Sequence, residues 1–185
     1  MIPHFFNPDE FPLQTEKEDY FMYIGRLTDR KGWRIAQDVC DRKGVRLLVA
    51  GRPEPGQGFD GYGEYLGVLA PADRAAAVGG ARAIFMPTRY IEPFGCVAAE
   101  ALLCGTPVIS SDTGGATEIV QHGYNGWRCR SLFDYMQAVD YAEMGTIDYE
   151  DIAIDARARY SMQQVGGKYD DYFSKLAQGE GWYAL

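Results

Sequence analysis

Short apolar segments alternate with segments of helical character along most of the chain. The predicted strands lie at 20–24, 45–50, 64–69, 83–86, 107–110 and 127–129. Helices are expected between them, at 32–42, 71–78 and 94–104, with another beginning within 113–118 and one at 131–144. Continuous apolar strands separated by helices are typical of a parallel sheet covered on both faces. The pattern predicts an α/β fold, a Rossmann-like three-layer α/β/α domain with a parallel sheet of about six strands.

The stretch 86–112 contains the most informative strand–helix–strand unit. Glu92-Pro93 precedes a helix of small residues, and Gly105 follows its end. Proline in the first helical turn and glycine just past the last turn are the expected punctuation of such a helix. A second glutamate, Glu100, lies within the helix. The unit therefore places one carboxylate at the helix mouth and another inside it.

The geometry of this helix suits a nucleoside diphosphate. The first amides, near Phe94, Gly95 and Cys96, lack intrahelical acceptors and form the positive end of the helix dipole, which favours a phosphate. Glu100 lies roughly 7–8 Å further along the axis, at about 1.5 Å per residue. That spacing matches the distance from a diphosphate to its ribose hydroxyls. Glu92, outside the mouth, could hold a sugar beyond the diphosphate.

Two plainer interpretations of the glutamates stay open at this point. Glu92 could cap the helix, and Glu100 could be a solvated residue on its surface. The helix is mostly apolar, however, and lies between buried strands. A poorly solvated carboxylate needs partners. The interpretation as a solvated surface residue is therefore weaker for Glu100 than for an isolated helix glutamate.

The order of these motifs resembles that of a known enzyme family. Glu92 and Glu100 form the E-x7-E motif of retaining glycosyltransferases, within the segments Glu-Pro-Phe-Gly, Ala-Glu-Ala and Gly-Thr-Pro-Val-Ile. The chain is similar to glycosyltransferase family 4 (group 1) over roughly residues 2–145. The resemblance implies the C-terminal, donor-binding half of a GT-B fold. It also implies transfer of a sugar from a nucleoside-diphosphate sugar with retention of configuration and without a metal ion.

Further site residues follow from the resemblance. Gly25, Arg26 and Lys31 match the family's G-R-x4-K pattern, in which the arginine and the lysine neutralise the diphosphate. Taken alone, these two cations would more often be surface charges. In the family the backbone near the position of Leu69 meets the nucleotide base. A Gly-Gly segment, here Gly114-Gly115, lies near the donor and permits close backbone approach or simply a tight turn.

Composition narrows the classes of partner. The chain has 185 residues, 46% of them hydrophobic, and a formal net charge of −8 with a pI near 4.8. That balance argues against nucleic acid and anionic membranes as partners. No apolar stretch approaches the ~20 residues of a membrane span, and no signal peptide is recognisable. The four cysteines lack metal-type or redox-type spacing, and Cys96 and Cys104 are expected to be buried thiols. A reduced, cytoplasmic protein without a metal or another cofactor is expected.

The organisation expected from the chain has three parts. Residues 1–19 resemble an interdomain linker, residues 20–145 form the nucleotide-sugar-binding domain, and 146–185 form C-terminal helices packed on it. The last two helices, at 149–159 and 162–176, are expected to pack as a pair. Tyr169, Tyr172 and Phe173 make an aromatic stripe at helical spacing. Core packing explains such a stripe more often than contact with a partner does.

Two other classes of function compete with a transferase. One is a standalone nucleotide-sugar-binding module without activity of its own. It is favoured because the family's acceptor-binding domain would precede these residues, so that a missing domain, a separate subunit or self-association would complete the site. The other is a flavodoxin-like or receiver-like interaction domain, in which the glutamates would be incidental. The donor nucleotide (UDP, GDP or ADP), its sugar and the acceptor are not readable from these residues.

Overall fold

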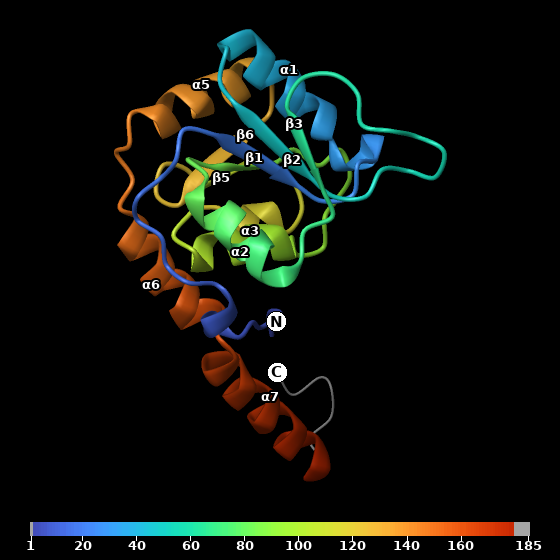
Figure 1. Ribbon diagram of the computed structural model, residues 1–185. Helices are drawn as coiled ribbons and strands as arrows, with labels where there is room; N and C mark the ends of the chain where they lie inside the picture. The colour runs from blue at the N-terminus through green and yellow to red at the C-terminus, as the bar shows by residue number, and fades with distance from the viewer. Residues whose placement is uncertain (1, 180–185) are drawn as a thin grey trace.

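The chain folds around one parallel sheet (Figure 1). The computed structural model describes residues 2–179. The strands are β1 (Phe21–Ile24), β2 (Leu47–Ala50), β3 (Glu64–Gly67), β4 (Ile84–Met86), β5 (Val108–Ser111) and β6 (Gly126–Cys129). The helices are α1 (Trp33–Lys43), α2 (Pro71–Gly80), α3 (Cys96–Leu103), α4 (Ala116–Ile119), α5 (Leu132–Glu143), α6 (Tyr149–Tyr160) and α7 (Met162–Ala177). All neighbouring strands pair in parallel, in the order β3-β2-β1-β4-β5-β6. The predicted fold class is confirmed.

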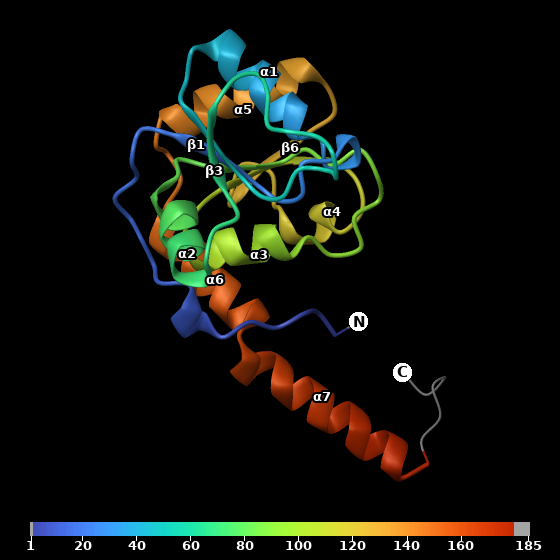
Figure 2. The same cartoon turned by 45° about the vertical axis from the view of Figure 1, so that its right-hand side comes forward.

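Alternate residues of the strands feed two separate hydrophobic cores. Phe21 and Tyr23 of β1 point toward α1 and α5, whereas Met22 between them points toward α2, α3 and α6. In β4, Phe85 belongs to the core under α1 and α5, whereas Ile84 and Met86 belong to the core under α2, α3 and α6. Because side chains alternate across a strand, buried runs of this kind require a helical layer on each face. Figure 2 shows the two layers, with α1 and α5 on one side of the sheet and α2, α3 and α6 on the other.

The central helix α3 is shorter than expected. It begins at Cys96 rather than at 94, with Gly95 at the N-cap, and it ends at Leu103. Of the two thiols predicted to be buried here, Cys104 is buried but Cys96, the first helical residue, is exposed. The prediction for Cys96 is wrong because the first turn of α3 lies at the carboxyl ends of the central strands, where no described element covers it.

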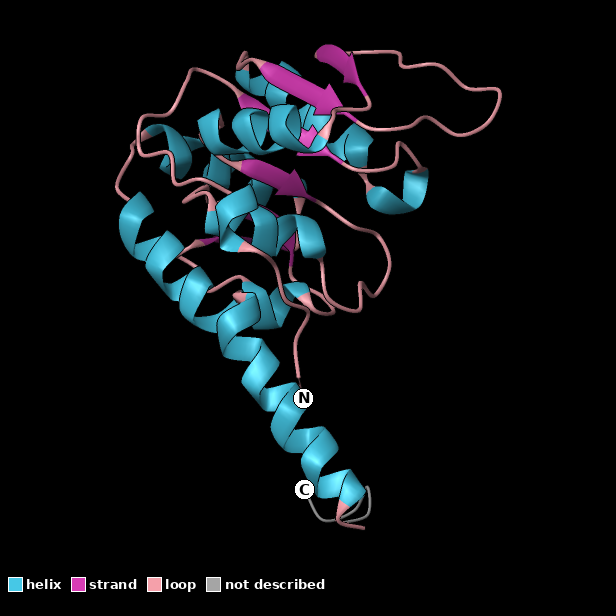
Figure 3. Cartoon of the chain, turned by 60° about the horizontal axis from the view of Figure 1, so that its bottom comes forward, coloured by secondary structure: helices cyan, strands magenta, loops and turns pink. Residues whose placement is uncertain are grey.

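The C-terminal helices do not pack as a pair. α6 lies along α3, but α7 runs on from α6 and extends away from the sheet (Figure 3). Val165 is the one buried residue in α7, and Phe173 has 59% of its surface exposed. The three aromatic residues of the predicted stripe belong to neither core, so the prediction of core packing is wrong. None of the described helices is both long and apolar enough to cross a lipid bilayer.

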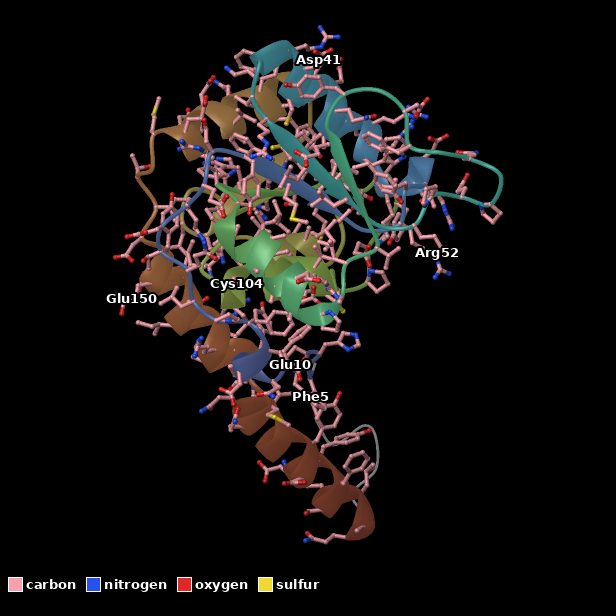
Figure 4. The ribbon with its side chains drawn as sticks, in the orientation of Figure 1. Phe5, Glu10, Asp41, Arg52, Cys104 and Glu150 are labelled. Atoms are coloured by element: carbon pink, nitrogen blue, oxygen red, sulfur yellow. The ribbon has the colours of Figure 1, made fainter. Side chains whose placement is uncertain are left out.

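The N-terminal segment is fixed along the α2–α3–α6 side of the domain. The backbone of Phe6 pairs with the α6–α7 junction through bonds to Tyr160 and Met162. Phe5, labelled in Figure 4, contacts the ring of Tyr169 edge-on. Further along, the ammonium of Lys17 donates to Gly79 O at 2.7 Å and to Thr106 Oγ1 at 2.9 Å. This segment therefore brings its side chains close to α3.

Candidate functional site

The strand order reverses direction between β1 and β4, and a cavity of about 190 Å³ lies at their carboxyl ends. In open α/β sheets such a reversal leaves a crevice where ligands bind. The cavity is lined by residues from the loops after both strands and from the start of α3. Five of the residues singled out from the sequence line it: Gly25, Lys31, Glu92, Gly95 and Cys96.

The N-terminus of α3 opens into this cavity. Gly95 adopts a left-handed conformation with φ of 90°, and no side chain caps the helix. A Cβ atom on Gly95 would lie 3.0 Å from the sulfur of Met86, so the position favours glycine in both conformation and space. The first amides of the helix therefore keep their donor capacity, and the positive end of the helix dipole points into the cavity. This arrangement is suited to an anionic group.

Glu92 lies in the loop between β4 and α3, and two donors hold its carboxylate. Lys31 donates to Glu92 Oε2 at 2.6 Å, and the hydroxyl of Tyr90 donates to the same oxygen. The side chains of Lys31 and Glu92 have exposed fractions of 24% and 13%. Glu92 does not cap α3, so the capping interpretation is wrong. The partly buried geometry gives this pair more weight than a surface ion pair.

The ionisation of the pair reflects these contacts. Burial alone would raise the pKa of Glu92, but the hydrogen bonds from Lys31 and Tyr90 and the charge of Arg26 hold it below its ordinary value. Burial opposes the charge of Lys31 as well, but its bonds to Glu92 and Tyr90 raise its pKa. Arg26 is exposed. Two cations beside one carboxylate leave a positive balance at the mouth of α3, in a chain whose net charge is −8.

The paired glycines approach the protein's own loop. Gly115 N donates to Glu92 O at 2.7 Å. A Cβ atom on Gly114 would lie 2.7 Å from Glu92 O, and one on Gly115 would lie 2.7 Å from Pro93 O. The segment before α4 therefore packs against the backbone of 92–94 and fixes its position. The glycines thus support Glu92 from behind, and their approach to a ligand stays a prediction.

Glu100 lies on the side of α3 that faces α2, at a second cavity of about 320 Å³. It is 7% exposed, so the interpretation as a solvated helix residue is wrong. Its carboxylate forms an ion pair with Arg74 of α2. Arg74 Nε is buried and has no hydrogen-bond acceptor among the described residues. The cavity also receives the rings of Phe5, Phe6 and Phe11 from the N-terminal segment.

The remaining predicted residues lie near the two cavities without lining them. Leu69 packs against the core beside α3, and Phe94 does the same. The ring of Phe94 contacts His4 edge-on, with 4.9 Å between ring centroids. Larger hollows of about 630 and 350 Å³ lie beside β4–β6 and α5. Neither is lined by a residue singled out from the sequence, and their shared charges, Asp112 and Arg130, pair with each other at 2.6 Å. We therefore place the candidate site at the two cavities against α3.

Comparison with known proteins establishes the family. Residues 7–143 match the model of the glycosyl transferases group 1, and the chain belongs to this family. A glycogen synthase of Mycobacterium tuberculosis is 30% identical over 80% of this chain and 38% of its own length. A D-inositol 3-phosphate glycosyltransferase of Jonesia denitrificans is 42% identical over 58% of this chain and 30% of its own length. The chain thus spans about a third of the length of these relatives.

Solved structures agree with the fold. A glycosyltransferase involved in avilamycin A biosynthesis superposes with a TM-score of 0.83 at 21% identity, over 97% of this chain and 58% of that one. The Anabaena protein HepE, solved in complex with UDP and glucose, gives 0.78 at 18% identity, over 92% and 55%. The chain is thus the C-terminal, Rossmann-like half of a GT-B fold. The expected family resemblance is confirmed, and the receiver-like alternative is wrong.

Two residues that contact the predicted glutamates were not themselves predicted from the sequence. Tyr90 precedes Glu92 by two positions, and Arg74 lies 26 positions before Glu100. Tyr90 lies in a loop, where no periodicity indicates which way a side chain points. Arg74 is in the first turn of α2, where an arginine is usually a surface charge. Arg74 lies close to Glu100 because α2 packs against α3, and this tertiary contact leaves no local signal in the sequence.

We predict that Gly115→Ala lowers the free energy of unfolding by about 1–3 kcal/mol, since the added methyl group has no room beside the 92–94 backbone. Gly166→Ala is the matched control, because Gly166 lies within α7 and its Cβ atom would meet nothing within 4 Å. The control should stabilise the chain by about 0.5–1 kcal/mol. Urea unfolding of both variants measures the difference. Equal stability of Gly115→Ala and Gly166→Ala would show that the packing of Gly115 against the 92–94 backbone does not stabilise the fold.

We predict a pH-dependent loss of stability for Glu92→Gln. The pKa of Glu92 is lowered on folding, so its contribution is present above its ordinary pKa near 4.5 and is lost as the pH falls through the folded value. The variant should be less stable than the wild type by about 1–2 kcal/mol at pH 7, and the difference should shrink toward pH 4. Denaturant titrations across this range measure it.

Glu64→Gln provides the control for that series. Glu64 pairs with Arg46 at 2.9 Å, but both side chains are 56% exposed. An exposed pair is screened by water, so this variant should follow the wild type at every pH. A constant gap between Glu92→Gln and the wild type from pH 7 to pH 4 would contradict the ionic origin of the effect.

Proposed function

We propose that this chain is the donor-binding domain of a retaining glycosyltransferase that uses a nucleoside-diphosphate sugar. One observation carries the proposal: an uncapped N-terminus of α3, the cation Lys31 and the carboxylate Glu92 meet in one cavity where the strand order reverses. Donors for an anion and an acceptor for hydroxyl groups therefore lie side by side. A diphosphate linked to a sugar has both kinds of group.

The diphosphate would lie at the mouth of α3. The first amides of the helix would bind its oxygens, and Arg26 and Lys31 would neutralise its charge. Lys31 pairs with Glu92 in this structure, but an ammonium carries three hydrogens and can serve both groups. When the bond between the sugar and the diphosphate breaks, negative charge grows on the departing oxygen. Cations fixed in advance at that place lower the barrier.

The nucleoside would extend from there toward Glu100. Glu100 and Arg74 supply an acceptor and a donor in the same cavity, where they form an ion pair, and Arg74 Nε has no hydrogen-bond acceptor among the described residues. Ribose hydroxyls can satisfy both, since each hydroxyl donates and accepts. The neighbouring phenylalanine rings provide an apolar surface on which a base can pack. We assign the contact with the base also to the backbone near Leu69.

Glu92 would orient the sugar. In the reaction the bond from the anomeric carbon to the diphosphate oxygen breaks, and a bond to an acceptor hydroxyl forms on the same face. The acceptor proton leaves with the nucleoside diphosphate. A carboxylate fixed by Lys31 and Tyr90 can hold a sugar hydroxyl in one orientation during this exchange. The acceptor would reach the sugar from the side of the cavity opposite α3.

The relatives' greater length bears on catalysis. The solved structures with this fold have nearly twice as many residues, and this chain corresponds to one half of them. The other half would hold the acceptor and close over the donor. A nucleotide-sugar-binding module without activity of its own is the second candidate, favoured by the open edge at Cys96 that no described element of this chain covers.

We predict that the chain binds a nucleoside diphosphate or its sugar conjugate. Calorimetric titration with UDP, GDP and ADP, and then with UDP-glucose, GDP-mannose and ADP-glucose, tests this. UDP is the first probe, because HepE was solved with UDP and glucose. At least one nucleotide should give saturable heat. Absence of heat and of any chemical-shift change with all six at millimolar concentration would refute the proposal.

Within that experiment, Glu100→Gln tests the ribose contact. The variant should weaken binding by about 1–3 kcal/mol, the scale for hydrogen bonds to a charged group. Glu143→Gln, at the exposed end of α5 on the other face of the sheet, is the control and should bind like the wild type. Unchanged affinity of Glu100→Gln would assign Glu100 to the stability of the α2–α3 contact instead.

We predict that the isolated chain binds donor but transfers sugar poorly. Holding two reactants in register accounts for roughly 7–11 kcal/mol of barrier lowering, and one half of the fold holds only one of them. Transfer and donor hydrolysis are measured on the chain alone and after addition of an acceptor-binding half from a relative. Efficient transfer by the chain alone would show that these 185 residues contain a complete active site.

A further inference from the structure

The carboxylate of Glu92 is held on one side only. Lys31 Nζ and the Tyr90 hydroxyl both donate to Oε2, and Oε1 receives no hydrogen bond from the described residues. The ammonium of Lys31 also lies 5.1 Å from the centroid of the Tyr90 ring. The three groups thus form one cluster in which Tyr90 contacts both the anion and the cation. Oε1 is the oxygen left for a ligand.

The two donors differ in what a ligand does to them. An incoming diphosphate competes with Glu92 for Lys31, because it carries more negative charge than one carboxylate. Tyr90 carries no charge, so the diphosphate does not attract it in the same way. When Lys31 is shared between the diphosphate and Glu92, the bond from Tyr90 is the contact with Oε2 that the diphosphate does not weaken. With 13% of its side chain exposed, Glu92 has little water to replace a lost partner.

We propose that Tyr90 is a positioning residue that keeps Glu92 oriented toward the sugar of the donor, so that the site distinguishes a nucleotide sugar from the free nucleotide. The inference rests on the proposed function, because it needs a donor in the cavity. Tyr90 acts through Glu92 and has no contact of its own with the diphosphate. Its loss therefore affects the sugar conjugate selectively.

The experiment compares Tyr90→Phe with the wild type in titrations of UDP, GDP and ADP and of UDP-glucose, GDP-mannose and ADP-glucose. Phenylalanine keeps the ring beside Lys31 and removes only the hydroxyl. The affinity for the sugar conjugate should fall about tenfold, which corresponds to about 1.4 kcal/mol, and the affinity for the matching free nucleotide should stay within about twofold. Thermal unfolding of each variant confirms that it is folded.

A matched control comes from the opposite edge of the sheet. The hydroxyl of Tyr62 donates to Val45 O at 2.9 Å, next to the start of β3 and β2. Tyr62→Phe removes a comparable hydrogen bond far from the cavity and should leave both affinities unchanged. Incorporation of 3-fluorotyrosine at position 90 keeps the hydroxyl and should retain the discrimination of the wild type, whether or not the phenylalanine variant is less stable.

The pH dependence of the two affinities distinguishes a positioning role of Tyr90 from a purely structural one, which would not change it. The groups facing Glu92 are Lys31, Arg26 and Tyr90, with Tyr23 and Cys96 also lining or adjoining the cavity. The hydroxyl of Tyr90 lowers the pKa of Glu92, so its removal raises that pKa. As the pH falls toward 4, the preference for the sugar conjugate should therefore begin to fall at a higher pH in Tyr90→Phe than in the wild type.

The outcomes separate the two proposals. If the wild type binds none of the six compounds, the proposed function fails. If the wild type binds and Tyr90→Phe weakens the nucleotide and the conjugate equally, or neither, the role of Tyr90 is overturned while the donor site stands. That role is overturned as well if 3-fluorotyrosine behaves like phenylalanine. Selective loss of the conjugate, with the fluorinated residue retaining it, supports the proposal.

Discussion

The candidate site depends on a carboxylate that is held, with little solvent, next to the positive end of a helix. Glu92 is stable there as an anion because Lys31 and Tyr90 donate to it and Arg26 adds a nearby positive charge. The backbone of the same loop is fixed from behind by Gly115. A poorly solvated charge must be compensated by partners in fixed positions. The contacts that hold Lys31 and Tyr90 on Glu92 therefore also hold the loop between β4 and α3 in place.

The net charge of the site is positive, whereas the net charge of the whole chain is negative. A chain of net charge −8 presents two cations and an uncapped helix N-terminus at one point of its surface. Local electrostatics of this kind act over a few ångströms and are screened at greater distance. The acidic remainder therefore does not prevent an anionic ligand from binding, and it discourages nucleic acid from doing so.

α3 links the two cavities by its length and its packing. Its first residue opens on the cavity of Glu92, and Glu100, in its second turn, faces the cavity of Arg74. The small side chains between them let α3 lie close to the sheet and to α6, which keeps both ends in register. A helix with large side chains would stand further from the strands, and the two cavities would move apart.

The amino-acid sequence by itself determined the layered α/β fold, the order of strands and helices, and the family, because hydrophobic period and motif spacing are local properties of the chain. It also placed Lys31, Glu92 and Gly95 near one edge, since the carboxyl ends of parallel strands share that edge, whereas Glu100 lies in a second cavity. Only the tertiary structure decided their partners. Tyr90 on Glu92, Arg74 on Glu100 and Gly115 behind the loop are contacts between segments whose mutual distance no local pattern encodes. The course of α7 away from the sheet was decided in the same way, because an aromatic stripe indicates a face to be covered but not what covers it.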